Sequence, residues 1–120
     1  MKILVTGGAG FIGSALIKEL LKDKKNKIFC LDNFFSSNDT EFIDDVVYIP
    51  GSTNNISNLV KFKPDIVYHL GEYSRISTSF DEIRTVWRLN VEGTFRVLEF
   101  CRKNKCKLVY AGSSSKFGNS

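Results

Sequence analysis

The stretch TGGAGFIG, from Thr6 to Gly13, directly follows the apolar run KILV at residues 2–5. Four of its eight residues are glycine. A glycine inside a helix or a strand costs roughly 0.5–1 kcal/mol relative to alanine, so such a density of glycine is rare within regular structure. The stretch therefore predicts a turn between a strand and a helix whose backbone another group must approach closely.

The spacing Gly8-x-Gly10-x-x-Gly13 is typical of a turn that binds a dinucleotide. In such a turn Gly10 leaves room for a pyrophosphate, Gly13 lets the helix pack on the strand, and the helix N-terminus offers free N–H groups to the phosphates. The second apolar run ends in FCLDN, with Asp32 lying 19 residues after Gly13. A carboxylate there accepts hydrogen bonds from a ribose diol and repels a 2′-phosphate, so NAD is favoured over NADP. The alternative is that Asp32 is a turn residue and the glycines form only a tight loop.

Five short apolar runs, continuous rather than alternating, predict strands buried on both faces of a parallel sheet. They span residues 3–5, 28–31, 46–49, 66–70 and 108–111. Helices are expected over residues 11–22, from Ser52 or Thr53 to residue 61, and from Ser79 or Asp81 to about residue 103. In the first helix, helical spacing relates Ile12, Ala15, Leu16, Glu19 and Leu20. In the last helix, the residues expected to face the sheet are Val86, Leu89, Asn90, Gly93, Val97 and Leu98. This order predicts an α/β fold, a Rossmann-like doubly wound parallel sheet with strand order 3-2-1-4-5 that is incomplete within this chain.

The composition is that of one soluble globular domain: 120 residues, 42% of them hydrophobic and 25% charged. The net charge of +4 gathers in two runs, residues 22–27 and 102–107, which we interpret as solvated helix ends rather than a surface for nucleic acid. No run of 18 apolar residues is present, so no membrane partner is expected.

Three cysteines, an odd number without metal-ligand spacing, favour reduced thiols and a cytoplasmic location, with Cys30 buried in a strand. The single histidine, His69, is expected to be buried and hydrogen-bonded rather than catalytic, and no metal site is predicted.

Five motifs, in order along the whole chain, resemble the NAD-dependent epimerase/dehydratase family, which are extended short-chain dehydrogenases acting on nucleotide sugars. The motifs are VTGGAGFIGSAL, LDNFFSS, PDIVYHLGEYSRISTSF, NVEGTFRVLEFCRK and KLVYAGSSSKFG. The resemblance implies NAD as cofactor and a nucleoside-diphosphate sugar as substrate, which is oxidised to a keto intermediate. It further implies that Ser113 is a catalytic residue that hydrogen-bonds the reacting hydroxyl. The residues that it implies for binding the cofactor are Gly7, Gly10, Phe11, Ile12, Gly13, Asp32, Asn33, Ser36, Ser52, Leu70, Gly71 and Asn90.

The chain departs from the family pattern in several places. Ser52 stands where the family usually has an aspartate near the adenine, and Gly71-Glu72 stands where it has a pair of small residues. The family's catalytic Tyr-x-x-x-Lys is absent, because none of the four tyrosines is followed four residues later by lysine.

Residues 1–120 are therefore expected to be the N-terminal NAD-binding Rossmann domain of a longer enzyme of this family. The Tyr-Lys segment and the substrate domain are expected beyond Ser120. By the resemblance, the parent would form a homodimer through the helix over residues 83–103. The alternative hypothesis is a non-catalytic NAD-binding sensor or a degenerate paralogue. A reductase using NADPH is disfavoured by Asp32.

Overall fold

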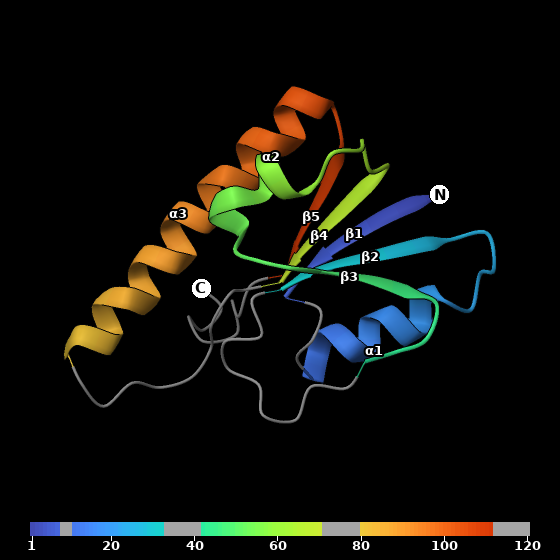
Figure 1. Cartoon of the computed structure of the whole chain (residues 1–120), viewed down its shortest axis with the longest axis horizontal. Helices are drawn as coiled ribbons and strands as arrows, with labels where there is room; N and C mark the ends of the chain where they lie inside the picture. The colour runs from blue at the N-terminus through green and yellow to red at the C-terminus, as the bar shows by residue number, and fades with distance from the viewer. Residues whose placement is uncertain (8–10, 33–41, 71–79, 112–120) are drawn as a thin grey trace, which may run out of the picture.

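The protein is described from a computed structural model of the 120-residue chain, which covers residues 1–7, 11–32, 42–70 and 80–111. Five parallel strands form a single sheet in the order β3-β2-β1-β4-β5 (Figure 1). The strands are β1 (Lys2–Thr6), β2 (Lys27–Asp32), β3 (Val46–Pro50), β4 (Ile66–Leu70) and β5 (Lys107–Ala111). All five predicted strands and the predicted strand order are confirmed.

Successive residues of each strand point to opposite sides of the sheet, so both faces carry apolar side chains that must be covered. Helices cover both faces. Helix α1 (Phe11–Leu20) covers one face, where Ile17 packs with Ile3 and Val5. On the other face lie the short helices η1 (Thr53–Asn55) and α2 (Ile56–Leu59) and the long helix α3 (Phe80–Asn104). There Leu4 packs with Val97 of α3. The three inner strands β1, β2 and β4 are thus buried on both sides, as expected. The expectation is wrong for the edge strands β3 and β5, whose described residues are half-buried or exposed.

The residues of α1 that helical spacing relates are not the ones that the helix buries most deeply. Ile12 is 71% exposed, and Ala15 and Glu19 are exposed as well. The buried residues are instead Gly13, Ser14 and Ile17. The side of α1 that packs on the sheet is therefore centred on Ile17, and Ile12 lies on the solvent side.

In α3 the prediction is right at Gly93 and Val97, which are buried, and wrong at Leu98, which is 49% exposed. The buried stripe continues through Phe100 and Cys101, at helical spacing from Gly93 and Val97. The side chains of Val86, Leu89 and Asn90 lie outside the described residues.

The end of α3 is a Schellman-type cap. Lys105 has a positive φ of 58°, the N–H of Cys106 donates to the carbonyl of Cys101 at 2.9 Å, and the N–H of Lys105 donates to the carbonyl of Arg102 at 3.4 Å. The basic run at residues 102–107 therefore does mark a helix end. None of the three cysteines forms a disulfide, and Cys30 is fully buried, as predicted. Among the described helices, none has the length and apolar content needed to cross a membrane.

Candidate cofactor-binding site

The candidate site lies at the edge of the sheet where the carboxyl ends of the strands converge (Figure 1). From β1 the chain passes to β2 on one side, and it later returns to β4 on the other side. Open α/β sheets bind ligands outside the carboxyl ends of their strands at such a switch point. The fold therefore places the candidate site at the end of β1.

The glycine-rich stretch begins at this switch point. Gly7 has a φ of 75°, a left-handed conformation that favours glycine, and its N–H donates to the carbonyl of Leu31 at 3.0 Å. After the stretch, α1 begins at Phe11 and carries no acidic residue in its first turn. The partial positive charge of this helix N-terminus is therefore not offset by a carboxylate of its own first turn, which suits an anionic ligand.

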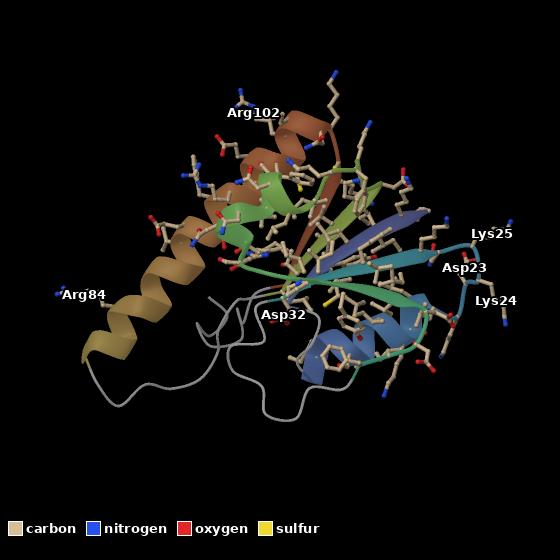
Figure 2. The ribbon with its side chains drawn as sticks, in the orientation of Figure 1. Asp23, Lys24, Lys25, Asp32, Arg84 and Arg102 are labelled. Atoms are coloured by element: carbon tan, nitrogen blue, oxygen red, sulfur yellow. The ribbon has the colours of Figure 1, made fainter. Side chains whose placement is uncertain are left out.

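Asp32 is the last residue of β2, the strand next to β1. Figure 2 shows it where the strand ends converge, at the opposite end of the sheet from Asp23, Lys24 and Lys25. The carbonyl of Asp32 accepts a hydrogen bond from the N–H of Gly51 at 3.0 Å, which ties the exit of β3 to the end of β2. The carboxylate predicted to hold a ribose is thus beside the glycine turn, although 25 residues separate it from Gly7 along the chain.

The segment after β3 contributes a further polar group to this edge. Gly51 has a φ of 150°, and a Cβ atom there would overlap Cδ1 of Leu59. The hydroxyl of Ser52 accepts a hydrogen bond from the N–H of Asn54 at 3.1 Å and so caps η1. The side-chain oxygen of Asn54 is buried and has no hydrogen-bond partner among the residues that the structure describes. Sequence reasoning missed Asn54, whose only signal is its position two residues after Ser52.

Directly beneath the glycine turn, a hydrogen-bonded bridge joins β1, β4 and α3. Nδ1 of His69 lies 2.6 Å from the hydroxyl oxygen of Thr6, and Nε2 lies 3.0 Å from that of Thr94. The ring also stacks on Tyr110 of β5, with ring centroids 5.5 Å apart. Burial lowers the pKa of His69 from 6.5 to about 4, so the imidazole is neutral near pH 7. The expectation of a buried, hydrogen-bonded histidine is confirmed, whereas its partners Thr6 and Thr94 were not predicted.

The structure brings together part of the predicted cofactor set at this edge. Gly7, Ile12, Gly13, Asp32, Ser52 and Leu70 lie at or next to the carboxyl ends of the strands or the start of α1. Phe11 and Asn90 are placed in the backbones of α1 and α3, while their side chains lie outside the described residues. Also outside the described residues are Gly10, Asn33, Ser36, Gly71 and Ser113.

The groups present fit the chemistry of NAD. A pyrophosphate needs a tight turn and a helix N-terminus, which Gly7 and α1 supply, and a ribose diol needs a carboxylate acceptor, which Asp32 supplies. Within the described part of the chain, no group of three or more His, Cys, Asp or Glu residues could hold a metal ion.

Comparisons with known proteins agree with this geometry. The model of the NAD dependent epimerase/dehydratase family matches residues 3–120. The chain is 32% identical over 123 residues to a UDP-N-acetyl-alpha-D-glucosaminuronate decarboxylase of Bacillus cytotoxicus, covering 98% of this chain and 38% of that protein. It is 30% identical over 113 residues to a dTDP-glucose 4,6-dehydratase of Salmonella typhimurium, covering 86% of this chain and 31% of that protein. The chain thus spans well under half the length of these relatives.

Solved structures show the same fold. A UDP-glucose 4-epimerase of Thermotoga maritima, with UDP-glucose, superposes with a TM-score of 0.78 at 26% identity over 92% of this chain and 37% of that one. The enzyme WbmG of Bordetella bronchiseptica, in complex with NAD, gives a TM-score of 0.73 at 28% identity over 92% of this chain and 36% of that one. Since the family model covers nearly the whole chain and the fold agrees, this protein belongs to the NAD-dependent epimerase/dehydratase family.

Proposed function

We propose that residues 1–120 are the NAD-binding portion of an enzyme that epimerises, dehydrates or decarboxylates a nucleoside-diphosphate sugar through a keto-sugar intermediate. The observation that carries this proposal is the meeting of three features at one switch point: the left-handed turn at Gly7, the start of α1 and the carboxylate of Asp32. The names of the decarboxylase, the dehydratase and the 4-epimerase, each of which includes a UDP- or dTDP-linked sugar, support the substrate class.

In this proposal each part of the edge binds one part of the cofactor. The turn after β1 and the N-terminus of α1 hold the pyrophosphate, Asp32 accepts hydrogen bonds from the adenosine ribose, and Ser52 lies toward the adenine. NAD, when bound, supplies a hydride acceptor for a sugar carbon. Ser113 hydrogen-bonds the reacting sugar hydroxyl, and a tyrosine paired with a lysine in the longer protein removes the proton.

The choice of NAD over NADP is tested at Asp32. The wild-type chain is expected to bind NAD more tightly than NADP in calorimetric titrations, because the carboxylate repels a 2′-phosphate. Asp32→Asn is expected to weaken NAD binding about tenfold through weaker hydrogen bonds to the ribose, and to narrow the preference for NAD.

Asp44→Asn is the matched control, because it removes an exposed carboxylate just before β3 and should leave both affinities unchanged. Equal affinity of the wild-type chain for NAD and NADP would contradict the proposed role of Asp32.

A non-catalytic NAD-binding sensor is the second candidate, favoured by the absence of Tyr-x-x-x-Lys from these 120 residues. The discriminating observation is the sequence that follows Ser120 in the gene. A Tyr-x-x-x-Lys soon after it favours the enzyme, and turnover of a nucleotide sugar by the longer protein, reduced by Ser113→Ala, would establish it.

We further propose that the longer enzyme is a cytoplasmic homodimer that pairs through α3. Three apolar side chains on α3 support the pairing, since they are about half exposed at helical spacing: Val91, Phe95 and Leu98. The location is supported by the three cysteines, none of which forms a disulfide.

A further inference from the structure

The bridge formed by Thr6, His69 and Thr94 is placed where the cofactor site is assembled. Thr6 is the last residue of β1 and directly precedes Gly7, which begins the glycine turn. Thr94 lies in α3 about one helical turn after Asn90, a residue of the predicted cofactor set. His69 stands between them on β4, in register with Thr6 on one side and with Tyr110 on the other.

The bridge restrains the position of α3 relative to β1 and β4 more specifically than the apolar packing around it can. Contacts between apolar side chains hold α3 against the sheet, but they are non-directional and allow small sliding movements. A neutral imidazole has one donor and one acceptor nitrogen, so it donates to one threonine hydroxyl and accepts from the other. Both bonds are needed to satisfy the ring, because Thr6 is 0% exposed and His69 is 1% exposed.

We propose that His69 is a positioning residue, which holds the start of the glycine turn at a fixed distance from α3 through its hydrogen bonds to Thr6 and Thr94. This inference rests on the proposed NAD-binding function. Its consequence is that a change at Thr94, on a helix that is not part of the turn, alters the binding of a pyrophosphate at the turn.

The experiment compares two substitutions at each end of the bridge. Thr6→Val and Thr94→Val keep the shape of the side chain but remove the hydroxyl. Thr6→Ser and Thr94→Ser keep the hydroxyl and with it the bridge, so they still test the proposal if a valine variant fails to fold. Titration with NAD and with ADP-ribose should show affinities about tenfold lower for each valine variant and within about threefold of wild type for each serine variant.

The double variant Thr6→Val/Thr94→Val tests whether the bridge acts as one unit. If the two threonines act independently, the double variant should bind NAD about a hundredfold less tightly than wild type. If the bridge acts as one unit, the double variant should bind NAD only about tenfold less tightly, like each single variant.

Val60→Ala is the control for a general loss of stability. Val60 is buried in the apolar cluster beneath α3, so its truncation destabilises the same face without touching the bridge. Affinity lowered equally by Val60→Ala and by Thr94→Val would overturn the proposal, as would a Thr94→Val chain that binds NAD like the wild type.

Hydrogen exchange at the Gly7 amide separates this inference from the proposed function. That amide donates to Leu31, and its exchange should be about tenfold faster in Thr94→Val than in wild type or in Val60→Ala. If the wild-type chain binds no NAD, the proposed function fails, and faster exchange at Gly7 still supports the bridge. Exchange at Gly7 that is unchanged by Thr94→Val would overturn the bridge as a positioning device.

Discussion

At the scale of single residues, the imidazole of His69 links the stability of the fold to pH. Its pKa in the folded chain is about 4, below the ordinary value of 6.5, because burial disfavours the charged form. Between these two values the unfolded chain binds more protons than the folded chain. This residue's contribution to the free energy of unfolding is therefore complete above about pH 6.5. It is lost as the pH falls toward 4, and the total loss is about 3 kcal/mol.

Urea unfolding at a series of pH values between 7 and 4 measures this loss. His69 is the only histidine of the chain, so the effect between pH 6.5 and 5, above the usual range of carboxyl groups, is expected to come from this residue. The control is His69→Gln, which is less stable at pH 7 but should show little dependence in that interval. A wild-type chain equally stable at pH 7 and pH 5 would contradict the prediction.

At the scale of single elements, the end of α3 holds a residue in an unfavourable conformation. Lys105 has a φ of 58°, where a side chain costs energy that a glycine does not. Lys105→Gly is therefore expected to raise the free energy of unfolding by about 0.5–1 kcal/mol, because glycine is the preferred residue at this position of a Schellman cap.

The control for this change is Lys103→Gly, two residues earlier and inside the helix. There glycine should lower the free energy of unfolding by about 1 kcal/mol. Opposite signs at the two lysines, measured by urea unfolding, are the expected result. Destabilisation by both substitutions would show that the left-handed conformation at Lys105 carries no cost.

At the scale of the whole molecule, the two edges of the sheet differ in their protection. The edge strand β3 ends in Pro50 and is preceded by the exposed residues Asp44 and Asp45. Proline and charge both discourage pairing with another chain. The other edge strand, β5, is apolar after Lys107, and Tyr110 is 59% exposed. We expect the 120-residue chain to associate with itself through β5, or to be only marginally stable in solution.

Sedimentation velocity on charged variants locates the contact. Tyr110→Lys should shift the chain toward monomer, whereas Val47→Lys, a matched change on the exposed side of β3, should not. Phe95→Glu separately tests the pairing through α3. A wild-type chain that sediments as a monomer and resists heating would count against self-association, and loss of association in Phe95→Glu alone would assign it to α3.

Much of the fold and part of the site follow from the order of residues alone. The continuous apolar runs determine five strands of a parallel sheet, of which the three inner ones, β1, β2 and β4, are covered on both faces. The glycines from Gly7 to Gly13 and Asp32 determine a turn and a carboxylate at strand ends, since their chemistry depends on local spacing. The strand order then follows from the general handedness of crossover connections.

The tertiary structure alone decided the rest. Which side of α1 is buried depends on how the helix is rotated when Ile17 packs against Ile3 and Val5, and a helical spacing of apolar residues does not contain that rotation. The bridge of His69 to Thr6 and Thr94 joins residues 63 and 25 positions apart. A threonine hydroxyl can bond to water, to backbone or to a side chain, so its partner is chosen only when packing excludes water and brings one acceptor or donor within reach.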